Sequence, residues 1–537
     1  MQARKLKYST NLILLIVIMF AILVVINFIS SKKFSRMDLT QNKVYTISDS
    51  TKNVLRNLDD IVTIKAYFSK ELPTYLLNLN SQIKDILSEY KAYAKGNLNI
   101  SFIDPADDEK LQNELRFLGI PQVQLQVINK DKAEVMKAYL GIAIMYGDKK
   151  EALPVVQSTQ NLEYDLTSAI VKVTSPEEKR LAFMSEHGGK ELDKDYKEIK
   201  KEIEKQYTIV TYEAKKGKKI PSNINTLVIA SPMNLTERDK YEIDQFIMNG
   251  GKVIFLIDSI SREEGGLQAN PASSNLEDLL VNYGVRINQN LVLDRSHSNA
   301  SFSSGFIRYS LPYPFWVKIL KQFLDKNNPI VSSLETLVFP WVCSLEIVQD
   351  KLEGLEAAEL VKSSTYAWDE TAPYDLNPQQ SFGKAQTNQN QYTLAVAVSG
   401  VFKSFYADKQ IPKPEFEEGD ETAPPDDSKR ETIAECKNPT QIIVVGNSVF
   451  TDDHFIAQFP GNALFFLNMI DWLTLGEQLI NIRSRGITDR PLKETTEKEK
   501  GRIKFLNMFG VSILVILFGI LKFILRKNRK RRLQQAS

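Results

Sequence analysis

The 537-residue sequence contains only two cysteines, Cys343 and Cys436, and only three histidines. Two cysteines are too few for a disulfide scaffold or a closed zinc site, and three isolated histidines do not form a metal cluster by their spacing. We therefore predict no metal and no cofactor. In an oxidising compartment the two cysteines could pair, although the apolar run Phe339 to Leu345 favours a small buried side chain at Cys343.

The formal net charge is only +2, so there is no general electrostatic attraction to nucleic acid. The composition is 43% hydrophobic and 25% charged, which is enough for two or three domains with their own cores. Basic residues are concentrated in residues 526–532. Because this cluster directly follows an apolar run, we interpret it as a membrane-flanking segment and not as a nucleic-acid tail.

Sequence motifs for nucleotide binding and nucleophilic catalysis are also absent. A phosphate-binding loop needs G-x-x-x-x-G-K-[ST], whereas the two Gly-Gly-Lys sequences continue with Glu191 and Val253. A nucleophile elbow needs small residues around its serine or cysteine, and the junction Asp258 to Arg262 has no flanking glycines. We therefore predict that the protein is not an enzyme.

Two long apolar runs bracket the chain, Leu12 to Ile29 and Phe505 to Leu525. Each approaches the roughly 20 apolar residues that a helix needs to cross a bilayer. The first run is longer than the apolar region of a cleaved signal peptide and has no A-x-A site, so we expect it to be retained. The sequence therefore predicts transmembrane helices at 12–29 and 505–525.

The expected orientation follows from the basic residues next to the second apolar run, because such residues stay on the cytoplasmic side. Two spans return the chain to its starting side, so both termini should be cytoplasmic and residues 30–502 should lie outside. Lys32, Lys33 and Arg36 weaken the charge contrast at the first span. We predict a two-pass protein of the bacterial inner membrane with a large periplasmic domain.

The first predicted domain, residues 37–175, follows residues 1–36 with the first span. Its patterns give the order βαβαββα, with strands expected at 62–68, 98–103 and 123–127, a hairpin at 139–156, and helices near 83–94, 111–118 and 162–173. This order resembles a thioredoxin-like domain, in which Pro121 would stand where a cis-proline is often found. Residues 1–175 contain no cysteine, so the redox C-x-x-C of such domains is absent.

The second predicted domain, residues 176–490, alternates between strand and helix patterns and precedes a last segment, 491–537, with the second span. Strands are expected at 181–184, 227–230, 253–257 and 442–445, with a capping box at Thr236 and Asp239 and a helix cap at Asn275. The alternation predicts an α/β, doubly wound parallel sheet of amidotransferase-like or Rossmann-like type. Two long insertions are expected at about 296–390 and 405–437, with polar loops at 371–391 and 412–429.

A candidate ligand crevice lies at the ends of two of these expected strands. The sequence Glu186-His187-Gly188-Gly189 follows the first strand, at the edge where open α/β sheets bind ligands. Asn447 and Ser448, with Asp452-Asp453 just beyond, follow another buried strand and could face the same crevice. A purely structural role is the alternative, since glycine turns and Asx-type hydrogen bonds also use these residue types. We predict no catalytic, cofactor-binding or metal-binding residue.

Several stretches resemble the auxiliary proteins of ABC transporters typified by the gliding-motility protein GldG. Their order and spacing carry the resemblance, which covers nearly the whole chain: residues 36–40 (RMDLT), 45–48 (YTIS), 61–68, 72–73, 250–253 (GGKV), 274–280 (SNLEDLL), 283–285 (YGV), 461–462, 472–473 and 483–486 (RSRG).

The resemblance implies a non-enzymatic subunit that works with an ABC permease and an ABC ATPase in gliding motility. Its periplasmic domain would bind a substrate or an envelope partner. The family supplies no catalytic residues, and His187 lies where it tends to have a Gly-His-Gly-type turn, with Glu186 in the first position here. Two alternatives stay open: a membrane-tethered periplasmic hydrolase using Glu186 and His187, and a structural adaptor of envelope machinery.

Overall fold

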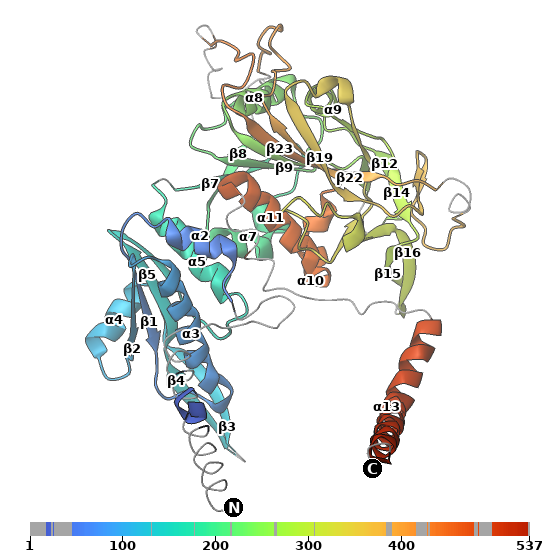
Figure 1. The fold of residues 1–537 in the computed structure, drawn as a ribbon. Helices are drawn as coiled ribbons and strands as arrows, with labels where there is room; N and C mark the ends of the chain where they lie inside the picture. The colour runs from blue at the N-terminus through green and yellow to red at the C-terminus, as the bar shows by residue number, and fades with distance from the viewer. Residues whose placement is uncertain are drawn as a thin grey trace, which may run out of the picture. The chain divides into compact units, whose positions relative to one another are not determined.

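The computed structural model describes residues 46–129, 132–176, 178–214, 217–262, 266–304, 307–382, 389–414, 427, 430–476, 482 and 497–534, and a few residues between 15 and 25. Figure 1 shows the fold. Contacts divide the chain into two units, residues 1–488 and 489–537. The first unit holds the sheets and the second holds one long helix.

The N-terminal sheet has four strands in the order β2-β1-β5-β6. Strand β1 (Val62–Phe68) pairs in parallel with β2 (Leu98–Ile103) and antiparallel with β5 (Leu140–Tyr146). Strand β6 (Lys149–Leu153) completes the sheet as the antiparallel partner of β5. The strongly apolar β1 and β5 therefore occupy the centre, where both of their edges are hydrogen-bonded.

Helices cover both faces of this sheet. Helices α2 (Asp49–Arg56), α3 (Leu77–Tyr93) and α5 (Leu162–Thr174) share one core with alternate residues of β1, while α4 (Glu109–Phe117) packs against Tyr67 on the other face. This division follows from the strand, whose successive side chains point to opposite faces.

Two details of the N-terminal domain differ from the sequence-based picture. The expected third strand, β3 (Val123–Asn129), pairs only with β4 (Lys132–Ala138) in a separate hairpin. The peptide bond before Pro121 is trans, and the cis bond that the structure does describe joins Ala372 to Pro373. The thioredoxin-like assignment stays a prediction.

The central sheet contains nine strands, five of which run parallel in the order β8-β7-β9-β10-β23. Their bounds are β7 (Arg180–Ser185), β8 (Thr208–Glu213), β9 (Thr226–Ala230), β10 (Lys252–Leu256) and β23 (Thr440–Val445). Every residue of β9 is buried, as expected for a central strand covered on both faces.

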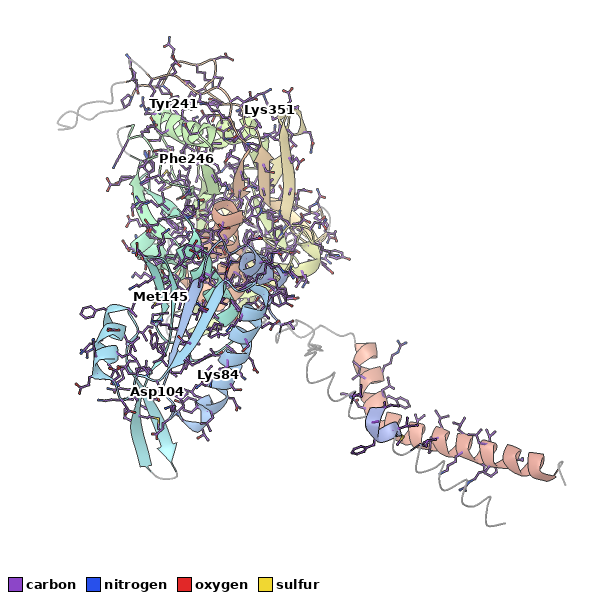
Figure 2. All side chains as sticks on the ribbon, turned by 60° about the vertical axis from the view of Figure 1, so that its left-hand side comes forward. Lys84, Asp104, Met145, Tyr241, Phe246 and Lys351 are labelled. Carbon is purple, nitrogen blue, oxygen red and sulfur yellow. The ribbon has the colours of Figure 1, made fainter. Side chains whose placement is uncertain are left out.

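Helices cover both faces of the parallel strands. Helices α7 (Lys197–Glu204) and α11 (Pro460–Leu475) contribute to one core, and α8 (Glu237–Met248) and α9 (Glu277–Asn282) to the other. Tyr241 and Phe246, labelled on α8 in Figure 2, are both buried. The specific name of this fold stays a prediction.

The other half of the central sheet is antiparallel, which the sequence analysis did not predict. Strand β22 (Thr393–Gly400) pairs antiparallel with β23, with β19 (Leu355–Lys362) and, through one residue pair, with β18 (Leu345–Ile347). Strand β13 (Val285–Ile287) ends the sheet beside β18.

The expected insertion at about 296–390 is built largely from strands and contributes β18 and β19 to the central sheet. Smaller sheets contain β14 (Leu291–Asp294) with β20 (Ala367–Glu370), β15 (His297–Ser304) with β16 (Ile307–Leu320) and β17 (Thr336–Pro340), and β11 (Ile260–Arg262) with β12 (Gln268–Pro271) and β21 (Tyr374–Asp375). Strand β21 lies within the expected loop 371–391, whereas most of 412–429 lies outside the described residues.

The second unit contains α13 (Glu497–Gln534), which carries large exposed apolar side chains between Ile503 and Leu525. Within the part of the chain that the structure describes, no helix is both long enough and apolar enough to cross a membrane. Most of the first expected span, 12–29, lies outside the described residues.

The two cysteines are free and buried. Burial raises the pKa of the Cys343 thiol to about 12, so it stays protonated at neutral pH. The buried interpretation of Cys343 is confirmed, and the alternative of a disulfide with Cys436 is not what the structure shows.

Candidate functional site

The loops that follow β7, β9, β10 and β23 meet at one edge of the central sheet. These strands are parallel, so their carboxyl ends point the same way, which is where open α/β sheets place ligands. We call this region the carboxyl edge. It contains the candidate residues Glu186, His187, Gly188, Gly189, Asn447 and Ser448.

The turn after β7 has an unusual backbone. Glu186, His187 and Gly188 have φ values of 84°, 52° and 67°, three consecutive residues in the left-handed region. This conformation costs about 1–2 kcal/mol for each residue that has a Cβ atom. A Cβ atom on Gly189 would lie 3.0 Å from the carbonyl oxygen of Ala230. The turn therefore needs glycine at the point where it passes closest to β9.

His187 points away from the centre of the carboxyl edge and toward α8. Its Nε2 lies 3.0 Å from Oδ2 of Asp239 and 2.9 Å from the carbonyl oxygen of Ala214. Both neighbours are acceptors, so Nε2 carries a proton in either charge state of the ring. The hydrogen bond to Asp239 raises the pKa of His187, while partial burial opposes the shift. The contact therefore favours the imidazolium form.

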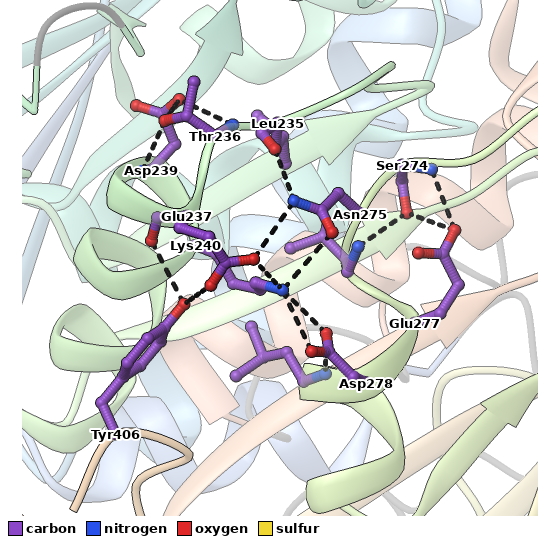
Figure 3. A network of polar contacts seen from close by, with 12 residues as sticks. Leu235, Thr236, Glu237, Asp239, Lys240, Ser274, Asn275, Glu277, Asp278 and Tyr406 are labelled. Carbon is purple, nitrogen blue, oxygen red and sulfur yellow. Dashed lines mark hydrogen bonds and ion pairs between the residues drawn. The ribbon is translucent and has the colours of Figure 1, made fainter. Parts of the chain in front are cut away.

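Asp239 is fixed by the first turn of α8 (Figure 3). Its Oδ2 accepts hydrogen bonds from the backbone nitrogen of Thr236 at 3.2 Å and from the Thr236 hydroxyl at 2.6 Å. The Thr236 oxygen in turn accepts from the Asp239 nitrogen, which completes a capping box. The capping box predicted from the sequence is confirmed, and its carboxylate also holds His187.

A buried lysine lies next to this cap. Lys240 is only 1% exposed, and its Nζ lies 2.8 Å from Glu237 and 2.9 Å from Asp278 (Figure 3). The hydroxyl of Tyr406 donates to the same Glu237 at 2.9 Å. A buried ammonium needs such partners because its desolvation is costly. This network ties α8 to α9 and to the segment after β22.

Asn275 does not cap α9, contrary to the sequence-based prediction. Its φ is 64°, the residue at the cap position is Leu276, and its Nδ2 donates to the carbonyl oxygen of Leu235 at 2.7 Å. The Glu277 carboxylate instead accepts from the backbone nitrogen of Ser274 at 2.9 Å. Asparagine tolerates left-handed backbone, which explains its presence in this turn.

Lys190 joins two loops of the carboxyl edge. Its Nζ donates to the carboxylate of Asp452 and, at 3.2 Å, to the carbonyl oxygen of Ser448. Burial raises the pKa of Asp452, and the nearby ammonium of Lys190 lowers it in part. The candidate turn after β7 and the candidate loop after β23 are thus brought together, through a lysine that the sequence analysis did not select.

Asn447 and Ser448 are fully buried and bonded within the protein. Asn447 donates through Nδ2 to the carbonyl oxygen of Pro340 at 2.6 Å, and its Oδ1 accepts from the Phe450 nitrogen at 2.9 Å. The backbone nitrogen and hydroxyl of Ser448 both donate to the Asp258 carboxylate. These hydrogen bonds fix the loop after β23 against the loop after β10.

Asp453 has a structural role beside the edge. Its two carboxylate oxygens accept hydrogen bonds from the backbone nitrogens of Lys197 and Glu198, each at 3.0 Å. A carboxylate at this position stabilises the amino-terminal end of α7, whose backbone donors are otherwise unpaired.

Charged side chains at the carboxyl edge form ion pairs with one another, as His187 does with Asp239 and Lys190 with Asp452. No serine, threonine or cysteine side chain among the described residues hydrogen-bonds to His187, whereas a nucleophile needs a base within such reach. The described residues also contain no group of three or more His, Cys, Asp or Glu side chains suited to a metal ion. Within the described part of the carboxyl edge, His187 therefore has hydrogen-bond and ion-pair partners but no nucleophile beside it.

Comparison with known proteins adds a family to this geometry. The family model described as "ABC-type uncharacterized transport system" matches residues 178–469, more than half of the chain. A second model, for a domain of unknown function, matches residues 41–145. The first match covers the carboxyl edge and every strand of the central sheet.

Individual relatives are distant. An uncharacterized protein of Borreliella burgdorferi is 27% identical over 509 residues, which cover 93% of this chain and 94% of that protein. Among solved structures, the mmIFT52 N-terminal domain (12% identity, 58% of this chain and 100% of that chain) gives a TM-score of 0.32. A putative ThuA-like protein of Bacteroides uniformis (11% identity, 56% and 92%) gives 0.29. These structural likenesses are too low to carry an argument.

Proposed function

Because the chain belongs to the ABC-type uncharacterized transport system family, we propose that it is a non-enzymatic auxiliary subunit working with an ABC permease and an ABC ATPase. The family match over residues 178–469 is the observation that carries the proposal. The sequence also supports the proposal, because the chain has no phosphate-binding loop and would need a separate ATPase subunit.

Membrane attachment is part of the proposal and rests on the sequence. The apolar runs 12–29 and 505–525 would hold the intervening domains on the periplasmic side of a bacterial inner membrane. Large apolar side chains on α13, including Leu517, Phe518 and Leu521, are more than half exposed in the isolated chain. An exposed apolar surface of this kind is unfavourable in water, so it would pack against lipid or the permease.

The physical test is co-purification from native membranes in mild detergent. We expect a tagged chain to retain both an ABC ATPase and a multi-span permease. The double variant Leu517→Lys with Leu521→Lys should lose both transporter subunits although the first apolar run still holds it in the membrane, since a charge within a span is costly. Lys504→Ala, just before the second apolar run, is the matched control and should retain both subunits. Co-purification of neither transporter subunit would disprove the proposal.

The proposed topology has an independent test. Alkaline phosphatase fused near Gly250 should be active, and the same enzyme fused after the basic tail should be inactive, because the enzyme folds only in an oxidising compartment. The opposite pattern would reverse the orientation.

A role in gliding follows only from the resemblance to the GldG family. It predicts that deletion of the gene in a gliding host abolishes colony spreading, and normal spreading would contradict it.

A further inference from the structure

A polar groove lies at the amino-terminal end of β22, where this strand pairs with both β18 and β19. Because β22 is antiparallel to β23, this end lies on the same side of the central sheet as the carboxyl edge, beyond the loop after β10. Its volume is about 670 Å³, within the range of ligand sites. We call it the β22 groove. Its lining comes from β18, β19 and β20, from the short helix η3 (Gln349–Lys351), from the start of β22 and from the segments beside these elements and β13: Asn288, Gln289, Asn290, Ser344, Leu345, Glu346, Ile347, Gln349, Glu359, Asp369, Thr371, Gln391, Tyr392 and Thr393.

The floor of the groove is organised by hydrogen bonds. Asn290 is 6% exposed and donates to the Ser344 hydroxyl and to the Asp369 carboxylate, both at 3.0 Å. The Tyr392 hydroxyl donates to the other oxygen of Asp369 at 2.9 Å. These side chains are therefore held in place before any ligand arrives, which lowers the entropic cost of binding.

The charges of the groove exclude anionic ligands. The three lining carboxylates are Glu346, Glu359 and Asp369, and no lysine or arginine lines the groove. The first two are paired with Arg286 at 2.8 Å and Lys362 at 2.6 Å. Asp369 is held by neutral donors and has no ion-pair partner among the described residues. A phosphate or carboxylate ligand would meet like charge here.

The lining also excludes an apolar ligand and favours one rich in hydroxyl groups. Leu345 and Ile347 are the aliphatic members, while five side-chain amides and several hydroxyl groups supply the rest. Each amide offers donors and an acceptor together, as a sugar hydroxyl does. Asn288 uses one amide hydrogen, for Ser344 Oγ at 3.0 Å, and Gln391 uses one, for the carbonyl oxygen of Ser363 at 3.0 Å. Both amides retain capacity for a ligand.

Strand β19 is irregular beside the groove. Its pairing with β22 shifts register between Glu359 and Val361 and again before Lys362. Such bulges redirect side chains and are common next to binding sites. Here the Glu359 carboxylate accepts a hydrogen bond from the Thr393 hydroxyl and so lies along the wall of the groove.

We propose that the β22 groove binds a neutral polyhydroxylated ligand, that is, a carbohydrate. Asp369, Asn288 and Gln391 hydrogen-bond to its hydroxyl groups, and the Tyr392 ring forms the adjoining wall. This inference goes beyond the transporter role and does not depend on it, because the chemistry of the groove is independent of any partner subunit.

The test is calorimetric titration of the full-length chain in detergent with chitotetraose, cellotetraose and maltotetraose. At least one should bind, whereas tetragalacturonate and inorganic phosphate should not. Asp369→Asn and Gln391→Leu should each weaken binding roughly tenfold or more, since a site built to hydrogen-bond a hydroxyl loses much when a partner is removed. Glu356→Gln, on the exposed part of β19 outside the groove, is the matched control and should bind normally.

Thermal unfolding of each variant separates loss of the ligand contact from loss of the fold. Gln391 is exposed, so Gln391→Leu should keep the unfolding temperature of the wild type. Absence of binding to every neutral tetrasaccharide at millimolar concentration would overturn the proposal. Binding that survives both groove variants, or preference for the acidic tetrasaccharide, would overturn it as well.

Discussion

The imidazole of His187 and the carboxylate of Asp239 lie 3.0 Å apart, between the turn after β7 and the first turn of α8. The histidine side chain is 19% exposed and the aspartate 3%. A contact this well shielded holds the left-handed turn at Glu186 and His187 against the helix. It also makes that turn sensitive to the protonation of one ring.

The His187–Asp239 contact should contribute stability at low pH. The folded-state pKa of His187 is raised, so its contribution is complete below the unfolded value of about 6.5 and is lost as pH rises through the folded pKa. We expect His187→Gln to lower the free energy of unfolding by about 1.5–3 kcal/mol near pH 5 and by less near pH 9. Denaturant unfolding of both proteins at the two pH values measures this, and a difference independent of pH would contradict it.

Breaking a buried charge network should lower the free energy of unfolding by more than losing the His187–Asp239 contact. Glu242 accepts from Arg238 at 2.9 Å and from both Nη atoms of Arg430 at 2.6 and 2.7 Å. Glu242→Ala would leave two guanidinium groups without this partner, so we expect a loss of about 3–5 kcal/mol. The exposed pair Glu198–Lys201 supplies the control, since Glu198→Ala should cost less than about 1 kcal/mol. Equal effects in denaturant unfolding would show that the network is not essential.

The buried carboxyl group of Asp471 should make the free energy of unfolding fall as pH rises, whereas a paired surface carboxylate makes it rise. Burial raises its pKa to about 8, although the hydrogen bond from Tyr207 lowers it in part. Between pH 4 and 8 the folded state therefore binds more protons than the unfolded state, and the free energy of unfolding falls as pH rises, by at most about 1.4 kcal/mol per pH unit. Asp471→Asn should flatten this dependence. An unchanged slope in unfolding experiments would refute the assignment.

The turn after β7 should not tolerate a side chain at Gly189. A Cβ atom there would lie 3.0 Å from the Ala230 carbonyl oxygen and 3.3 Å from that of Glu186, and neither backbone atom can move easily. We expect Gly189→Ala to cost about 1–3 kcal/mol. Gly119→Asn tests conformation without crowding, because nothing lies within 4 Å and asparagine tolerates its positive φ. It should cost less than Gly189→Ala when the thermal unfolding of the two variants is compared.

Four of the five parallel strands of the central sheet were predictable because each contains a short apolar run, whereas β8, with the sequence TIVTYE, was missed. Strand β10 and the capping box at Thr236 and Asp239 are examples in which one local pattern determines the element. The antiparallel half was not predictable in this way. Strand β19 reads LEAAELVK, which also suits a helix, and only its pairing with β22 decides the outcome.

The candidate site, too, could be predicted only in part from the sequence. The glycine turn at Gly188 and Gly189 has a local signature, and its place after a strand was evident. The partners of that turn were not, because Asp239 and Asp452 come from distant segments and Lys190 is one lysine among many. Hydrogen bonds between such segments depend on the tertiary fold and leave no periodic trace in the sequence.

Helix α8 reads as a polar surface helix, yet nearly all of its residues are buried, beneath the segments around 402–414 and 430–436. Part of its charged face pairs with groups on that cover, most directly Glu242 with Arg430. In an alignment of relatives, these two positions should therefore covary, with charge reversal or joint replacement by apolar residues, while either position changing alone should be rare.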